Sequence, residues 1–498
     1  MRKNHFAGLM AAAALAGCTV GPDYHPPVTA TPAAFAEPQG APPPGASIDP
    51  ATWWTVYGDA QLDQLIAAAL KDNPNMAIAA SRIRQARLQE IVAHAADKPQ
   101  VNADANVTHV EFSKNAGFAS LARLFGGQSG GGSGSGSGSA GGIALPGSGI
   151  TTYAVGFDAS WELDLFGGAR RGVEAAKART EGAVWSERDV EVTLAAEVAQ
   201  AYFALRLDQQ QRDVIQDEIA RQNRTLEIAG HVAKVGLVPQ IDVTRQRATL
   251  NSTEARLAPI AADIRVRTHA LGILTGQNPE ALIGSIDQPP AAALAPAPVI
   301  PAGLPSDLLR RRPDIRAAER QLAAANADIG VAVADLYPKF SLTGMTQLIS
   351  SALSNLFSTD SLQLTGTGAA MFPVLDWGKR KATVGLRKEA YEQAYQNYRM
   401  TVLRALKDVE DALVQIDAEH TRNTVLRRAV ADAETTARAV EAQYKTGFVA
   451  QDSLLNAETQ VLTAREQVAA SDAMLRQDSA ALFKALGGGW SERDAASR

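Results

Sequence analysis

The feature that most restricts the fold of this chain is a pattern that occurs in it twice. Residues 234–240 and 445–451 carry Lys, Gly, Val and Gln at the same places, 211 residues apart. The same offset aligns residues 166–167 with 377–378, where an aromatic residue precedes glycine. A repeat of this kind indicates one supersecondary unit built twice, so both halves should contain the same elements in the same order.

The first copy carries an insertion. Pro99 and Pro338 match each other at an offset of 239, so the first half has 28 additional residues before the offset falls to 211. That part of the chain contains residues 126–142, an almost pure Gly/Ser tract. Such a tract cannot bury apolar area, and we predict a disordered surface loop at the tip of a hairpin.

Each half contains two segments with period-two alternation of apolar and polar residues. This pattern predicts strands with one apolar and one largely polar face. Strands of about ten residues are long enough to cross an outer membrane at a tilt. Four strands cannot close a barrel alone, so we expect several copies to close it together. The predicted strands are residues 100–112, 150–166, 339–348 and 361–374.

Long helices are predicted to follow the strands. Apolar residues recur at steps of three and four across residues 379–445, which is typical of a coiled-coil seam. One helix of this length would be roughly 100 Å long, and residues 170–234 give nearly the same length. Glycine then breaks each helix, and we predict return helices at residues 238–276 and 451–487 with a kink at Pro259. Shorter helices are predicted at residues 59–96 and 307–336.

The N-terminal region has the pattern of a lipoprotein signal. Residues 1–17 combine Arg2 and Lys3 with an apolar run that is too short to span a bilayer. Residues 15–18 read Leu-Ala-Gly-Cys, so we expect cleavage before Cys18 and acylation of that cysteine. An unmodified cysteine in an ordinary signal peptide is the alternative. No other stretch approaches 18 consecutive apolar residues, so any spanning part should consist of strands.

Composition argues against several other classes of protein. The net charge of −5 disfavours a general nucleic-acid binder. The seven histidines are scattered without metal-type spacing, and the chain has no nucleophile elbow or phosphate loop. We therefore predict a chain that is not an enzyme and holds no cofactor or metal. A periplasmic coiled-coil adaptor or scaffold is the competing interpretation, and the amphipathic hairpins count against it.

Four segments together carry a family signature. They resemble the TolC-like outer-membrane efflux proteins, and in particular the NodT-type lipoproteins that serve RND-type pumps. The resemblance covers essentially the whole mature chain. The matching segments are residues 18–24 (CTVGPDY), 53–54 (WW), 304–319 (LPSDLLRRRPDIRAAE) and 337–342 (YPKFSL).

The resemblance implies an α+β membrane protein that forms a homotrimeric duct. Each protomer would give four strands to one shared transmembrane β-barrel, and the long helices would form an α-barrel across the periplasm. The partners would be a periplasmic adaptor (membrane fusion protein), an inner-membrane RND pump and the outer-membrane lipid that holds the acyl anchor. The expected function is export of small molecules such as drugs or toxic compounds. The alternative is the outer-membrane channel of a type I protein-secretion system.

On this interpretation the chain divides into consecutive parts. The predicted parts are a signal peptide (1–17), a lipidated N-terminal extension (18–60), a first repeat (61–284), a Pro/Ala linker (285–303), a second repeat (304–487) and a C-terminal tail (488–498).

The resemblance places a periplasmic iris just after the helix-reversing glycines. A threefold ring of carboxylates there would attract cations. Relatives often carry aspartate where this chain has Asn456, which leaves Asp452 as the only obvious charged ring of the second turn. Solvated charges at helix ends are the alternative. The candidate gate residues are Asp242, Arg245, Gln451, Asp452 and Asn456.

Three acidic residues fall on the polar face of the first two predicted strands. These residues are Asp104, Asp158 and Glu162. Because polar faces point inward in closed barrels, we predict that they line the lumen, and a solvated face near the rim is the alternative. For the basic run at residues 310–312, a structural role around Pro313 is favoured over a polyanion site.

Overall fold

The structure is a computed structural model that describes residues 19–37, 48–111, 149–236, 239–286, 295–303 and 305–490. The described residues fall into two compact units. The first contains those within 19–23, 90–175 and 326–388, and the second contains those within 24–89, 176–325 and 389–490. Both long helices begin in the first unit and end in the second.

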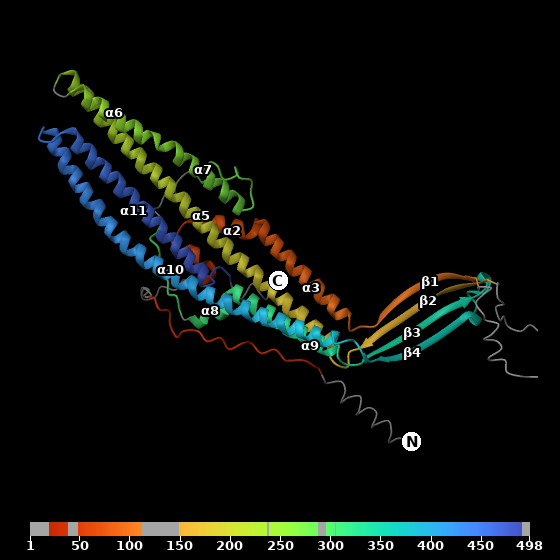
Figure 1. The fold of residues 1–498 in the computed structure, drawn as a ribbon. Coiled ribbons are helices and arrows are strands. Elements are labelled where there is room, and N and C mark those ends of the chain that lie inside the picture. Colours follow the sequence, from red (N-terminus) through yellow and green to blue (C-terminus); the bar gives the residue numbers. More distant parts are fainter. Residues whose placement is uncertain are drawn as a thin grey trace, which may run out of the picture. The chain divides into compact units, whose positions relative to one another are not determined.

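The first unit contains one antiparallel sheet with its strands in chain order (Figure 1). Its strands are β1 (Gln100–Glu111), β2 (Gly149–Leu163), β3 (Lys339–Ser350) and β4 (Leu362–Met371). The second strand ends three residues before its predicted end, and the fourth likewise ends at 371 rather than 374. The pairing of β2 with β3 joins the two halves of the sequence, and β1 and β4 are left as edges.

The register of the sheet repeats the duplication. Ala103 on β1 pairs with Phe157 on β2. The residues 239 and 211 positions later, Leu342 and Gly368, are partners on β3 and β4. The two offsets found in the sequence therefore describe the same hairpin built twice.

The long helices are α5 (Gly168–Lys234) and α10 (Lys379–Lys445), each 67 residues long. Glycines precede both helices with φ of 83° at Gly167 and 84° at Gly378. Gly236 and Gly447, just beyond the helix ends, both have φ of 77°, a left-handed conformation that favours glycine. The backbone conformations at the ends thus repeat as closely as the sequence does.

The return helix of the second half, α11 (Gln451–Ala485), is continuous, whereas that of the first half is not. The return helix predicted over residues 238–276 is interrupted next to Pro259, as expected, because α6 (Gln240–Ala255) ends before α7 (Leu257–Leu274) begins. Pro259 has no N–H for the carbonyl four residues earlier, and its ring crowds that carbonyl, so the hydrogen-bond ladder is interrupted here.

Prolines also divide the shorter helices that the sequence predicted as continuous. The helix predicted over residues 59–96 is two helices, α2 (Ala60–Asp72) and α3 (Pro74–Ala95). The helix predicted over residues 307–336 is likewise α8 (Pro305–Arg311) followed by α9 (Pro313–Ala334). Proline is favoured at a first helical position and disfavours a helical residue before it, so each proline starts a new helix.

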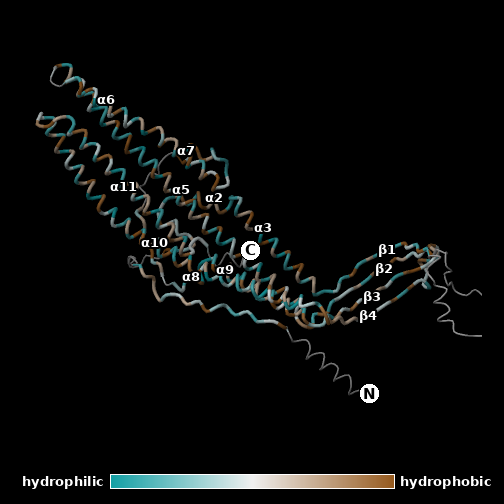
Figure 2. The backbone as a smooth tube through the Cα atoms, in the orientation of Figure 1, coloured by the Kyte–Doolittle hydropathy of each residue, from teal (hydrophilic) through white to brown (hydrophobic). Residues whose placement is uncertain are grey.

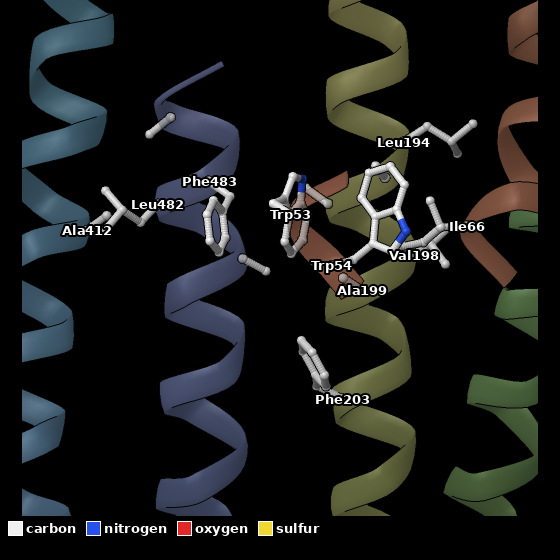
Figure 3. Close-up of a cluster of buried hydrophobic side chains, with 14 of the residues drawn as sticks. Trp53, Trp54, Ile66, Leu194, Val198, Ala199, Phe203, Ala412, Leu482 and Phe483 are labelled. Carbon is white, nitrogen blue, oxygen red and sulfur yellow. The ribbon is translucent and has the colours of Figure 1, made fainter. Parts of the chain in front are cut away.

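The second unit has an aromatic core (Figure 3). Trp53 from the 3₁₀ segment η1 (Pro50–Tyr57) stacks on Phe483 of α11 with ring centroids 4.9 Å apart. Tyr57 meets Phe203 of α5 edge-on at 4.8 Å. Trp53, Tyr57 and Phe203 are each at most 1% exposed. The segment predicted as an N-terminal extension is therefore part of the core.

Hydrophilic and hydrophobic residues alternate along the helices (Figure 2). Among the helices that the structure describes, none is both long and apolar enough to cross a membrane.

Candidate gate at the helix turns

The first turns of α6 and α11 bring three of the predicted gate residues together in the second unit. Arg245 Nη1 lies 3.8 Å from Asp242 Oδ1 on the same helix. The same nitrogen lies 3.5 Å from Asp452 Oδ1 on α11. One guanidinium thus bridges carboxylates from the two repeats. All three side chains keep access to solvent, so each ion pair contributes at most about 1 kcal/mol.

A pocket of about 380 Å³ lies at this cluster. The ends of α5 and α10 supply its apolar walls, among them Val232 and Tyr444. Burial, and then the negative charge of Asp242, raise the pKa of the Tyr444 phenol. In the sequence, Tyr444 was only the last apolar residue of the coiled-coil pattern across residues 379–445. Its position beside Asp242, Arg245 and Asp452 was therefore not predicted.

Gln451 differs from the other predicted gate residues because it is 4% exposed. Its Nε2 donates a hydrogen bond to Oε1 of Gln246 on α6 at 3.2 Å. Gln246 is fully buried, and its Nε2 donates to the carbonyl of Gln222 on α5 at 3.5 Å. Gln451 therefore joins three helices in the interior of the bundle.

Sequence analysis missed Gln246, although a signal for it exists. The buried residues of α6 are Val243, Gln246, Leu250 and Thr253, spaced by three and four. A glutamine at an otherwise apolar seam position is a mark of a specific polar contact between helices. Asn456, by contrast, is exposed on α11 and is not among the residues that line the pocket.

The three acidic residues of the strands share one face of the sheet. Asp158 is the register partner of Asn102, whose Nδ2 donates to Asp158 Oδ2 at 3.1 Å. Asp104 lies two residues along β1 from Asn102, and Glu162 lies four residues along β2 from Asp158, so all three point to the same side. Glu162 Oε1 also lies 3.5 Å from Lys339 Nζ. On β3 and β4 this face continues with the polar residues Ser341, Thr343, Gln347, Gln363, Thr365 and Thr367.

A family model described as outer membrane efflux protein matches residues 65–277 and 304–488. The two matched segments fall one in each half of the duplication, and together they cover most of the chain. The chain belongs to the outer membrane efflux protein family. The resemblance to TolC-like efflux proteins is thereby confirmed.

Relatives of this efflux protein match it over almost their whole length. Nodulation protein T of Rhizobium leguminosarum bv. viciae is 28% identical over 485 residues, which are 97% of this chain and 93% of that protein. The cation efflux system protein CusC of Escherichia coli is 28% identical over 487 residues, 97% of this chain and 98% of that protein. The solved outer-membrane channel OprN is 29% identical with a TM-score of 0.82, covering 95% of this chain and all of that one.

This efflux protein is thus an outer-membrane exit duct of a tripartite efflux system with the TolC-like fold. Two of its predicted features, Cys18 and the Gly/Ser tract at 126–142, lie outside the described residues. Within the described residues, no group of three or more His, Cys, Asp or Glu side chains is placed to hold a metal ion.

Proposed function

We propose that the protein works as a homotrimer that closes one ring of strands in the outer membrane and exports small molecules without a catalytic step. An inner-membrane RND pump and a periplasmic adaptor would deliver the cargo, and the acyl chains on Cys18 would add a lipid anchor. Asp104, Asp158 and Glu162 would line the pore. Asp242, Arg245, Gln451, Asp452 and Asn456 would form the periplasmic gate.

The observation that carries this proposal is an aromatic contact that the first repeat makes within one chain and that the equivalent residue of the second repeat does not make. Within the first unit, Phe166 after β2 stacks on Tyr337 before β3 with ring centroids 4.7 Å apart. The equivalent of Phe166 in the second repeat is Trp377, which is 90% exposed. A second copy that presented its first repeat to this tryptophan would reproduce the contact.

The helices of the first unit support the same arrangement. Gly330 on α9 packs against the start of α5, where a Cβ would lie 2.7 Å from Arg171 Cγ. The equivalent of Gly330 on α3, 239 residues earlier, is Ile91, which is 63% exposed, and the next residue, Val92, is 70% exposed. Ile91 and Val92 in the first repeat and Trp377 in the second are exposed apolar side chains. Exposed apolar side chains in both repeats suit head-to-tail association, in which the first repeat of one copy contacts the second repeat of the next.

The edge strands complete the argument. β1 and β4 each present an unpaired row of backbone N–H and C=O groups, which would need partners in a membrane. On β2 and β3, Ala159 pairs with Gly344. The equivalent of Ala159 on β4, 211 residues later, is Ala370, and the equivalent of Gly344 on β1, 239 residues earlier, is Ala105. If β4 pairs with β1 of the next copy in the same register, Ala370 therefore lies opposite Ala105. Both residues then fall on the apolar face, so the register is self-consistent.

Disulfide crosslinking tests this register. The double variant Ala105→Cys, Ala370→Cys should form covalent oligomers up to the trimer on non-reducing gels, and reduction should return the monomer. In the control, Ala105→Cys with Ala369→Cys, the second cysteine points to the other face, so crosslinking should be at least several-fold weaker. Equal crosslinking of both pairs, or monomers from both, would contradict head-to-tail closure.

A type I protein-secretion channel remains the second candidate. The N-terminal lipoprotein signal and the Arg-Arg-Arg-Pro-Asp-Ile run favour the RND class. Copurification with the adaptor and pump encoded beside this protein would distinguish the two, because an RND pump and a protein-secretion ATPase differ in composition.

A further inference from the structure

Two glutamates on different helices of the second unit have buried carboxyl oxygens or are buried whole. Glu218 on α5 is fully buried. Glu458 on α11 lies close enough that the charge of Glu218 acts on it, and its Oε2 is buried without a hydrogen-bond partner among the described residues. A buried carboxylate oxygen without a donor is costly when charged and tolerable when protonated.

Glu218 has hydrogen-bond donors beside it, whereas Glu458 has a second acidic residue near it. Glu218 accepts hydrogen bonds from Arg221 and from Gln222 Nε2, the latter at 2.9 Å. On α10, Glu441 adds negative charge near Glu458, and Lys445 Nζ lies 2.7 Å from Glu441 Oε1. Burial first, and then Glu218, raise the pKa of Glu458 to about 7, with Glu441 adding to this and Arg221 opposing it.

Hydrogen bonds connect Glu218 to Gln451 of the proposed gate. The Gln222 side chain binds Glu218, and its carbonyl accepts from Gln246 on α6. Gln246 in turn accepts from Gln451, which precedes Asp452 of the Arg245 cluster. Glu218 on α5 and Gln451 on α11 therefore belong to one buried polar network, and the exposed Asp452 of the charged cluster follows Gln451 directly in the chain.

We propose that Glu458 is a proton-operated latch, whose protonated form holds α11 against α5 and whose ionised form loosens the iris. This inference rests on the proposed gate and adds a means of regulating it. The ordinary pKa of glutamate is 4.5, so the packed arrangement binds its proton more tightly than a loosened one. Its stability is therefore lost as pH rises from about 4.5 to about 7 and stays lower above that range.

Conductance in planar bilayers tests the latch. Wild-type trimers should conduct several-fold more at about pH 8 than at about pH 4.5, and the rise should take place between about pH 4.5 and 7. Glu458→Gln should conduct at the low level throughout, and so should Glu458→Met, which also removes the charge at similar volume. Asp432→Asn neutralises an exposed carboxylate on α10 and should behave as wild type. A Glu458→Gln variant that titrates like wild type would overturn the latch.

An infrared titration separates this idea from the proposed duct. The wild-type protein should lose protonated-carboxyl carbonyl bands as pH rises through about 6 and about 7, and Glu458→Gln should lack the band that titrates near 7 and keep the one of Asp478 near 6. Trimers that form no pore at all would refute the duct, and the titration would still decide the latch. A conducting wild type without the band would refute the latch alone.

Discussion

Arg312, the last residue of the basic run at 310–312, holds neighbouring helices together. Its Nη2 lies 2.6 Å from Asp314 Oδ2, and its Nη1 donates to Asp408 at 3.2 Å and to the carbonyl of Ala485 at 3.0 Å. The side chain is only 11% exposed, whereas Arg310 is 77% exposed and pairs with Asp307. These contacts between α8, α9, α10 and α11 favour the structural role over a polyanion site.

At the gate, a single arginine holds carboxylates from both repeats. Replacing Asp242 and Arg245 together with alanine removes both ion pairs without leaving an unpaired arginine, so the iris should open more readily. Loss of about 1 kcal/mol corresponds to roughly a fivefold rise in open probability in planar bilayers. Asp452→Ala should weaken cation preference, measured as a shift in reversal potential under a salt gradient.

Arg247→Ala provides the control for these gate variants. Arg247 is exposed on α6 two residues beyond Arg245, and replacing it should leave conductance unchanged. If the double variant and Asp452→Ala both match the wild type in conductance and selectivity, the constriction lies elsewhere in the bundle.

At the scale of elements, equivalent positions of the two repeats carry different charges. In the first, Arg267 of α7 forms an ion pair with Asp208 of α5. The equivalent positions 211 residues later hold Asp478 and Glu419, two acids. Burial, and then Glu419, raise the pKa of Asp478 to about 6. Duplicated backbones thus acquire different electrostatics.

We predict that the Gly/Ser tract between β1 and β2 is dispensable. Glu111 and Gly149 are register partners, so the strand ends already meet across the connecting segment. Deleting residues 126–142 shortens that segment and should change the free energy of unfolding by less than about 1 kcal/mol, because closure entropy depends weakly on loop length. Heat-induced dissociation of the trimer on gels measures this. Loss of the trimer would show that the tract has a structural role.

For the whole molecule, the proposed lipid anchor adds to an attachment that the strands already make. Val20 N donates to the Phe166 carbonyl at 3.1 Å, so the chain just after Cys18 is tied to the start of α5. Each buried methylene of an acyl chain would contribute about 0.8 kcal/mol to membrane affinity. Cys18→Ser behind a non-lipoprotein signal should still reach the outer-membrane fraction. Mass spectrometry that found an uncleaved, unacylated wild-type N-terminus would contradict the anchor.

Local patterns in the sequence determined the outline of this protein. Period-two alternation located all four strands, and steps of three and four located α10. The 211-residue repeat then located α5 and the glycines that follow both helices. Such features depend on the backbone and on residues close in sequence, so one sequence suffices to read them. The helix divisions at Pro74 and Pro313 were missed because seam periodicity continues across an interrupted hydrogen-bond ladder.

The tertiary structure decided which polar side chains are buried and what they meet. Gln451 was expected in the gate, and its burial against Gln246 became visible only when α6 and α11 were packed together. The charge of Glu218 acts on Glu458 although 240 residues separate the two in sequence. Desolvation and Coulomb interactions act through space, so neither the orphaned oxygen of Glu458 nor its raised pKa follows from any local pattern.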